Sequence, residues 1–182
     1  MMATTCPVSI ITGGPGTGKT TILNQVLSIF ERSGIVTVLA APTGRAAKRM
    51  EQATLRPAKT IHRLLEYGAT PGEDIEGFEA RFTRDEDNPI EADAVIVDEM
   101  SMVDIFLFYN LMQAIAPGTR VILTGDSEQL PSVGPGNVLK DIIASKCLPV
   151  SVLKEVFRQQ GNIALNAQRV QQGEGIDRKS VV

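Results

Sequence analysis

The amino-acid sequence predicts an α/β protein with a parallel sheet and helices on both of its faces. Short apolar runs of strand length alternate along the chain with longer segments whose apolar residues recur at helical spacing. The runs expected to form strands are nearly continuously apolar, as in strands buried on both faces, and they are residues 8–11, 35–41, Ala94–Val97 and 120–123. Ligands of such sheets bind beyond the carboxyl ends of the strands, so the residues that follow each run are the first candidates for a site.

Three segments have the pattern of helices. In residues 18–33 apolar side chains recur on one face, and Gly34 follows in the position favoured for a left-handed cap. Residues 102–115 and 137–144 are expected to form two further helices. The repeated order of strand and helix implies right-handed crossovers between parallel strands.

The composition is that of an ordinary globular domain. A length of 182 residues suits one domain, or one domain and part of another, with a sizeable core. The net charge of −3 gives no general basic field, so any nucleic-acid contact must come from a local patch. No apolar run approaches the ~20 residues of a membrane span, and the N-terminus lacks a signal-peptide core. The isolated Cys6 and Cys147 are expected as thiols in a reducing cytosol, which predicts a cytoplasmic location without membrane attachment.

The most informative stretch is a glycine-rich loop between the first expected strand and the first expected helix. Gly13, Gly18, Lys19 and Thr20 match the pattern G-x-x-x-x-G-K-[ST] of a phosphate-binding loop. Glycines let the backbone turn its N–H groups toward a phosphate, and the start of the following helix adds further donors. Lys19 can reach the β- and γ-phosphates, and the Thr20 hydroxyl can bind Mg²⁺. We expect ATP and Mg²⁺ as cofactors, with the nucleotide bound by Gly14, Pro15, Gly16, Thr17, Gly18, Lys19, Thr20 and Thr21.

Acidic and amide side chains follow two later strands. Asp98 and Glu99 come directly after Ala94–Val97. Asp98 can hold Mg²⁺ opposite Thr20, and Glu99 can deprotonate the water that attacks the γ-phosphate. A second carboxylate at this point favours hydrolysis over transfer to a substrate hydroxyl. Gln129, after the next strand, can hydrogen-bond the γ-phosphate and the attacking water, and can thereby sense whether ATP or ADP is bound.

A local basic segment follows the second expected strand. Residues 43–66 contain six basic and two acidic residues, which gives +4 in a chain that is acidic overall. Threonine and histidine side chains and the amides at helix starts suit contacts with a sugar–phosphate backbone that do not read the bases. The alternatives are a solvated helix face without DNA and, for His62, a structural role. The candidate contacts with single-stranded DNA are Pro42, Thr43 (also a candidate N-cap), Gly44, Arg45, Thr60, His62 and Arg63.

Residues 72–93 interrupt the order of strands and helices. They carry nine acidic residues against two arginines, which gives −7, together with glycines, prolines and weak periodicity. We expect a mobile acidic insertion at about residues 68–93, with a short hairpin near residues 77–83 as one form of it. Its default interpretation is a solvated loop without direct chemistry.

Six segments taken together resemble the motor core of superfamily 1 DNA helicases. They are GGPGTGKT (13–20), APTGRAAKRM (41–50), TIHRLL (60–65), VDEMSMVD (97–104), LTGDSEQLPSVGPGNVLKDI (123–142) and LKEVFRQ (153–159). The resemblance is strongest to the RecD-like branch, which comprises the α-subunit of exodeoxyribonuclease V and its stand-alone relatives. It extends over about residues 7–172 and implies a P-loop NTPase with a RecA-like sheet.

The resemblance also implies roles for individual residues. Lys19 corresponds to the lysine that binds the phosphates, and Thr20 and Asp98 correspond to the residues that bind Mg²⁺. Glu99 corresponds to the catalytic base and Gln129 to the sensor of the γ-phosphate. Arg158 corresponds to an arginine that approaches the γ-phosphate from the second lobe's side of the cleft. Family members hydrolyse ATP and move 5′→3′ along single-stranded DNA in recombination and repair, some of them with nuclease subunits. The resemblance thus implies an ATP-dependent DNA helicase.

The resemblance further implies that the chain has two unequal parts. Residues 1–150 correspond to the first RecA-like ATP-binding lobe, and residues 151–182 to motif IV and the start of a truncated second lobe. Because an arginine from the missing second lobe can be worth ~10³–10⁵ in rate, this fragment should bind nucleotide but hydrolyse it poorly. Two other interpretations stay open: a P-loop kinase or nucleotide-dependent switch, and a regulatory ATP-binding module without DNA contact.

Overall fold

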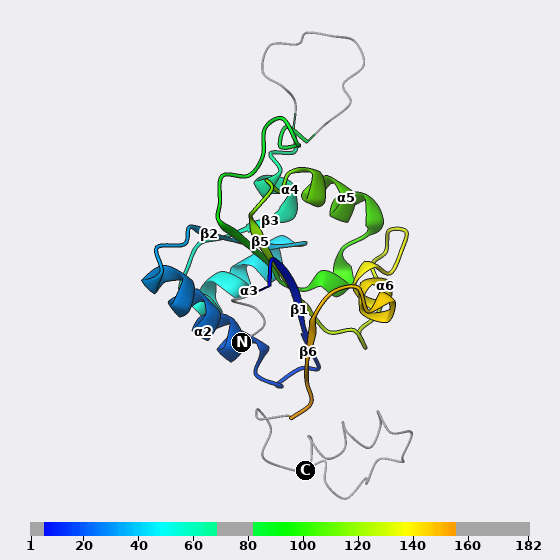
Figure 1. Ribbon diagram of the computed structural model, residues 1–182. Coiled ribbons are helices and arrows are strands. Elements are labelled where there is room, and N and C mark those ends of the chain that lie inside the picture. The colour runs from blue at the N-terminus through cyan, green and yellow to red at the C-terminus, as the bar shows by residue number, and fades with distance from the viewer. Residues whose placement is uncertain (1–5, 69–81, 156–182) are drawn as a thin grey trace, which may run out of the picture.

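The computed structural model describes residues 6–68 and 82–155, which contain one sheet of six parallel strands (Figure 1). The strands are β1 (Val8–Gly13), β2 (Thr37–Ala41), β3 (Ala58–Thr60), β4 (Ala94–Val97), β5 (Arg120–Gly125) and β6 (Val150–Leu153). Their order in the sheet is β3-β2-β4-β5-β1-β6, and every neighbouring pair is parallel. The predicted parallel α/β sheet is confirmed.

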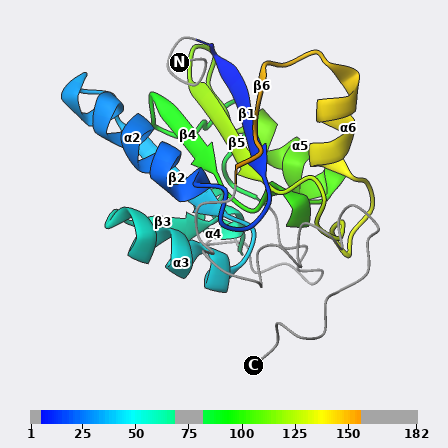
Figure 2. The same ribbon diagram turned by 90° about the horizontal axis from the view of Figure 1, so that it is seen from below.

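Helices cover both faces of this sheet, as predicted (Figure 2). One face carries α2 (Lys19–Arg32) and α3 (Gly44–Thr54), and the other carries α4 (Ile61–Leu64), α5 (Ile105–Gln113) and α6 (Val138–Ser145). Alternation along β4 produces this two-sided core, because Ala94 and Ile96 pack with the first set of helices and Val95 and Val97 with the second. Every residue of β4 is buried, as its central place in the sheet requires.

The first helix agrees closely with its sequence pattern. α2 buries Leu23, Val26, Leu27 and Phe30 on one face, and Gly34 follows in the expected left-handed conformation with a φ of 68°. Throughout the described part of the chain, no helix has the length and apolar character needed to cross a membrane.

The helix expected over residues 102–115 begins later and ends earlier than predicted. A 3₁₀ turn, η1 (Met100–Met102), comes first, and α5 starts only after Asp104. The Asp104 carboxylate accepts a hydrogen bond of 2.8 Å from the N–H of Leu107, which the helix would otherwise leave unpaired. This N-cap sets the start of the helix, although the apolar periodicity extends further back.

The two edge strands, β3 and β6, are absent from the sequence prediction because each is short and only partly apolar. β6 pairs with β1 and places Leu153 opposite Gly13. It therefore crosses the boundary expected between residues 150 and 151. The division into a first lobe and the start of a second stays a prediction, since residues 156–182 lie outside the described part of the chain.

The second half of the expected acidic insertion is hydrogen-bonded to the end of α5 and to the residue before β2. Ile90 is buried, and its N–H donates to the Ala114 carbonyl at 2.8 Å. The Asp93 carboxylate accepts a hydrogen bond of 2.8 Å from the N–H of Val36. Residues 82–93 are therefore anchored by Ile90 and by these hydrogen bonds. The acidic side chains of the segment are all exposed to solvent, and they are Asp85, Glu86, Asp87, Glu91 and Asp93. Residues 69–81, with most of the expected hairpin, lie outside the described residues.

Candidate nucleotide-binding site

The carboxyl ends of the parallel strands meet at one edge of the sheet. The phosphate loop follows β1, Asp98 and Glu99 follow β4, and the turn that leads to Gln129 follows β5. Since β5 pairs with both β4 and β1, these three segments are neighbours. The N–H of Ser127 accordingly donates to the Thr12 hydroxyl at 3.3 Å, across 115 positions of sequence. The strand order thus assembles the residues that sequence patterns single out separately.

The loop between β1 and α2 has the backbone that its glycines predict. Gly16 and Gly18 have φ values of 80° and 87°, a region that other residues rarely adopt. Thr17 is buried, and its hydroxyl donates to the Gly14 carbonyl at 2.8 Å, which ties the turn together. No side chain caps the start of α2, so its first N–H groups retain the capacity to bind an anion.

Lys19, the first residue of α2, extends back over this loop. Its ammonium donates to the carbonyl oxygens of Gly13 and Gly14, the second at 3.0 Å. The ammonium therefore lies where the chain leaves β1, beside the amides of the turn. The oxygens of a bound phosphate would be stronger acceptors for it than neutral carbonyls. Pro15, Thr20 and Thr21 are exposed at the same surface.

Asp98 is oriented by the strands on both sides of β4. The hydroxyl of Thr124 in β5 donates a hydrogen bond to the Asp98 carboxylate. The Asp98 N–H donates to the carbonyl of Ala40 in β2 at 2.9 Å. A carboxylate held in this way at the sheet edge is suited to bind a divalent cation.

Glu99 is half-buried and has a left-handed backbone with a φ of 55°, which is uncommon outside glycine and is frequent at functional sites. Burial is the main cause that raises the pKa of its carboxyl, and the charges of Asp98 and Asp126 raise this pKa further. The positive charges of Lys19 and Arg49 act in the opposite direction. Groups from the phosphate loop, α3 and the turn after β5 are therefore close enough to act on one carboxylate. A carboxylate of raised proton affinity suits the role of a general base.

Gln129 is connected to the turn that follows Glu99. Its side-chain Oε1 accepts a hydrogen bond of 3.4 Å from the hydroxyl of Ser101 in η1. Its own N–H donates to the Asp126 carbonyl at 3.3 Å, so the turn after β5 sets its position. The Asp126 carboxylate is buried and accepts the N–H of Glu128 at 3.0 Å. Gln129 is exposed, and its partner Ser101 stands two positions after the expected base Glu99 in the sequence.

The side chains present fit a magnesium–nucleotide complex better than a cation held by protein alone. Among the described residues no group of three or more His, Cys, Asp or Glu side chains could hold a metal ion. Mg²⁺ bound with a nucleotide usually takes one or two protein oxygens and completes its shell with phosphate and water. The Thr20 hydroxyl and the Asp98 carboxylate supply oxygens of that kind and number.

The candidate DNA contacts lie at the carboxyl ends of β2 and β3, where Ala41 pairs with Thr60. Thr43 and Thr60 both cap the helix that follows, since their hydroxyls accept N–H groups at 3.2 and 3.1 Å. The expected N-cap role of Thr43 is confirmed. Around these caps, Gly44, Arg45, His62 and Arg63 are exposed and Pro42 is half-buried. Their contact with DNA stays a prediction.

Several supporting residues escape prediction from the sequence. Thr124 comes near the end of an apolar run, so its place beside the site can be predicted from the sequence. Its hydrogen-bond partner Asp98 is 26 positions away, and no local pattern predicts that contact. No local signal links Ser101 to Gln129 or Arg49 to Glu99. Arg158, the other expected active-site residue, lies outside the described part of the chain.

Comparisons with known proteins show the family to which this chain belongs. Residues 1–135 match the family described as AAA domain. The ATP-dependent RecD2 DNA helicase of Deinococcus radiodurans is 41% identical over 150 residues, which cover 82% of this chain and 19% of the relative. The RecBCD enzyme subunit RecD of Mycobacterium tuberculosis is 39% identical over 159 residues, covering 75% of this chain and 26% of the relative. The chain thus spans about a fifth to a quarter of the length of these relatives.

A solved structure supports the fold independently. The Pif1 helicase from Candida albicans has a TM-score of 0.59 with this chain at 23% identity, over 97% of this chain and 43% of that one. This likeness agrees with the RecA-like arrangement of the six parallel strands. By its matched family, its relatives and its fold, the chain belongs to the AAA domain family of P-loop proteins and resembles the first motor lobe of RecD-like helicases.

Proposed function

We propose that this chain is the ATP-binding and ATP-hydrolysing lobe of a helicase that moves 5′→3′ along single-stranded DNA. The observation that supports this most strongly is that the phosphate loop, Asp98 with Glu99, and the turn before Gln129 follow three neighbouring parallel strands and so lie at one edge of the sheet. An acid and an ammonium beside a half-buried glutamate form the charge arrangement that hydrolysis of a nucleoside triphosphate needs.

Nucleotide binding would begin at the loop after β1. The uncapped amides of α2 can take the phosphate oxygens, and the Lys19 ammonium can leave the Gly13 and Gly14 carbonyls for them. The Thr20 hydroxyl and the Asp98 carboxylate would hold Mg²⁺, which neutralises charge between the β- and γ-phosphates. The Thr124 hydroxyl keeps Asp98 in position for this role.

Hydrolysis would then depend on Glu99 and Gln129. The Glu99 carboxylate accepts a proton from the attacking water, and its raised proton affinity favours this transfer. Gln129 is bonded to Ser101, directly after the Glu99 turn, so a change in its contacts on loss of the γ-phosphate would be felt beside the base. This link gives the motor a means to register its nucleotide state.

The lobe would act on DNA together with a second RecA-like lobe and, as candidates, nuclease subunits. Arg45, His62 and Arg63 are exposed beside the helix caps and suit contacts with the DNA backbone. A second RecA-like lobe would close over the nucleotide, and Arg158 would approach the γ-phosphate from that side. One relative is a subunit of the RecBCD enzyme, so nuclease subunits are candidate partners.

The decisive experiment measures ATPase rate in a protein extended through the second lobe, with and without oligo(dT). We expect DNA to stimulate hydrolysis and Lys19→Ala to abolish both rates, because the phosphate loop loses its ammonium. A Lys19-dependent rate that is indifferent to DNA would instead support a regulatory ATPase module. A rate independent of Lys19 would refute the nucleotide site itself.

A salt titration tests the DNA path. Affinity for oligo(dT) should fall by roughly 0.7 log units per log unit of salt for each phosphate neutralised. Arg45→Ala should flatten this dependence by a similar amount, whereas Lys140→Ala, an exposed lysine on α6, should leave it unchanged. An unaltered slope for Arg45→Ala would move the DNA path elsewhere.

A further inference from the structure

A buried threonine directly precedes the phosphate loop. Thr12 pairs with Gly125 of β5 on one side and with Val152 of β6 on the other, so its backbone is fixed within the sheet. Its side chain lies on the same face of β1 as that of Ile10, which packs with α4, α5 and α6. Because Thr12 is only 3% exposed, it offers almost no surface to a ligand, and any effect on a bound nucleotide must act through another residue.

The Thr12 hydroxyl is bonded twice to one residue of the turn after β5. It donates to the Ser127 Oγ at 3.3 Å and accepts the N–H of Ser127 at 3.3 Å. A threonine hydroxyl has a single proton to donate, so this pair uses the whole donor capacity of the Thr12 side chain. Two bonds between the same residues restrict the orientation of Ser127 as well as its distance from β1.

Short-range hydrogen bonds carry this placement on to Gln129. The Ser127 hydroxyl donates to the Glu128 carboxylate at 3.5 Å. The N–H of Glu128 donates to the Asp126 carboxylate at 3.0 Å, and the N–H of Gln129 donates to the Asp126 carbonyl at 3.3 Å. Residues 126–129 therefore form one compact turn, and a bond that fixes Ser127 also fixes where the backbone of Gln129 lies.

Close packing holds the start of this turn from the other side. Gly125, the cross-strand neighbour of Thr12, lies so near η1 that a Cβ on it would be 3.1 Å from the nitrogen of Met100. The next residue of η1, Ser101, donates its hydroxyl to the side chain of Gln129 at 3.4 Å. Gln129 is exposed, so these polar contacts, rather than burial in the core, set its position.

We propose that Thr12 is a positioning residue of the nucleotide site, whose hydroxyl holds the turn after β5 where Gln129 meets the terminal phosphate of a nucleoside triphosphate. The inference rests on the proposed function, because it takes Gln129 as the residue that distinguishes ATP from ADP. A side chain that is placed in advance loses less conformational freedom when it bonds its ligand. Loss of the Thr12 hydroxyl should therefore weaken binding of the triphosphate and leave binding of the diphosphate unchanged.

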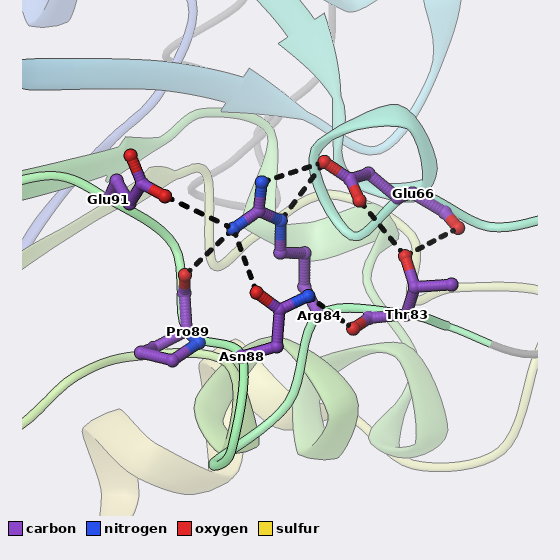
Figure 3. Close-up of polar contacts among 6 residues, drawn as sticks. All are labelled: Glu66, Thr83, Arg84, Asn88, Pro89 and Glu91. Atoms are coloured by element: carbon purple, nitrogen blue, oxygen red, sulfur yellow. Dashed lines mark hydrogen bonds and ion pairs between the residues drawn. The ribbon is translucent and has the colours of Figure 1, made fainter.

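The chain itself provides two matched controls. Ser9 lies on the same strand and is equally buried, but its hydroxyl has no hydrogen-bond partner among the described residues. Thr83 forms a second hydroxyl bridge, in which it donates to the carboxylate of Glu66 at 3.0 Å and to the carbonyl of Glu66 at 3.3 Å (Figure 3). That bridge joins the chain after α4 to the segment before β4 and includes no residue of β1 or β5.

The test measures, by calorimetry in magnesium buffer, the dissociation constants of the chain for ADP and for AMP-PNP, a non-hydrolysable ATP analogue. We expect Gln129→Ala to lower the preference for AMP-PNP over ADP by roughly tenfold to a hundredfold, as for one hydrogen bond to a charged group. Thr12→Val should lower this preference by a comparable factor, because valine has nearly the same shape without the hydroxyl. Thr12→Ser should retain the parent preference.

A double variant and the two controls complete the design. Thr12→Val combined with Gln129→Ala should lose no more than Gln129→Ala alone, because both changes remove the same contact with the nucleotide. Ser9→Ala and Thr83→Val should keep the parent preference. If Thr12→Val does not fold, Ser127→Ala removes the acceptor of the Thr12 hydroxyl at a half-buried position and should lower the preference by itself.

The outcomes separate this role from the proposed function. If Gln129→Ala lowers the preference and neither Thr12→Val nor Ser127→Ala does, the positioning role is refuted and the nucleotide site stands. Losses that multiply in the double variant, or an equal weakening of ADP and AMP-PNP by Thr12→Val, would refute the role as well. If Gln129→Ala leaves the preference unchanged, the sensor and its positioning residue both fail while nucleotide binding stands. If the parent binds neither nucleotide, the proposed function itself fails.

Discussion

The hydroxyl of Thr124 donates a hydrogen bond to the carboxylate of Asp98 and thereby joins the carboxyl ends of β5 and β4. Asp98 is the carboxylate expected to hold Mg²⁺, so its orientation depends on a residue of the neighbouring strand. Thr124 is buried, and no solvent molecule can readily replace its hydroxyl. The orientation of this candidate metal ligand is therefore set by the pairing of β4 with β5.

Removal of that hydroxyl should weaken magnesium use. In a protein extended through the second lobe, Thr124→Val should raise the Mg²⁺ concentration for half-maximal ATPase activity by about tenfold, because groups that orient a metal ligand contribute that much to affinity. Thr124→Ser should restore the parent value. Thr119→Val is the control, since the Thr119 hydroxyl bonds the Ala92 carbonyl before β5 begins. Equal shifts for both valine variants would contradict the orienting role.

Glu99→Gln should separate binding from turnover in the same extended protein. The amide keeps the shape of the side chain but cannot accept the proton of the attacking water. Nucleotide affinity in equilibrium titration should be retained, while kcat should fall by a factor of roughly 10²–10⁴. An unchanged kcat would exclude Glu99 as the base.

The raised pKa of Glu99 also predicts how stability varies with pH. Because burial raises this pKa above its ordinary value of 4.5, the folded state binds the proton more tightly than the unfolded state and the charged form lowers stability. In magnesium-free buffer, Glu99→Gln should therefore melt at a higher temperature than the parent at neutral pH. The difference should shrink as the pH falls through the raised pKa. Equal melting temperatures for the two proteins at neutral pH would contradict a destabilising charge on Glu99.

Glu31 should show the opposite pH dependence. Hydrogen bonds from Arg56, the shorter at 2.5 Å, lower the pKa of Glu31 and tie the end of α2 to the segment after α3. A lowered pKa gives stability that is present above the ordinary value of 4.5 and is lost as the pH falls below it. Glu31→Gln should lower the melting temperature at neutral pH and have a smaller effect in acid. Arg32→Gln serves as a control, because no ion pair of Arg32 occurs among the described residues.

Gly13 and Gly14 should differ sharply in their tolerance of a methyl group. A Cβ on Gly13 would lie 2.7 Å from the carbonyl oxygen of Leu153 in β6 and 2.7 Å from the Thr17 hydroxyl, whereas a Cβ on Gly14 would meet nothing within 4 Å. Gly13→Ala should thus reduce the free energy of unfolding by about 1–3 kcal/mol. Gly14→Ala should leave it nearly unchanged in denaturant titration. Equal losses would contradict the close contact between β6 and the phosphate loop.

Much of the fold and the site is predictable because the signals are local. The apolar runs identify four of the strands, and the glycine spacing from Gly13 to Gly18 identifies the phosphate loop, since each depends on a few consecutive residues. The edge strands β3 and β6 carry no such signal, because their partners supply most of what stabilises them. The start of α5 is displaced for a similar reason, as the Asp104 cap prevails over apolar periodicity.

The sequence by itself determined that polar residues follow apolar strands, and parallel strands necessarily bring such residues to one edge of a sheet. Only the tertiary structure decided which of them touch: Thr124 with Asp98, Ser101 with Gln129, and Tyr67 with Phe82. The physical reason is that these contacts depend on strand order and on loop closure over many residues. A local pattern specifies which secondary structure a segment can form, and the packing of segments distant in sequence specifies which side chains it contacts.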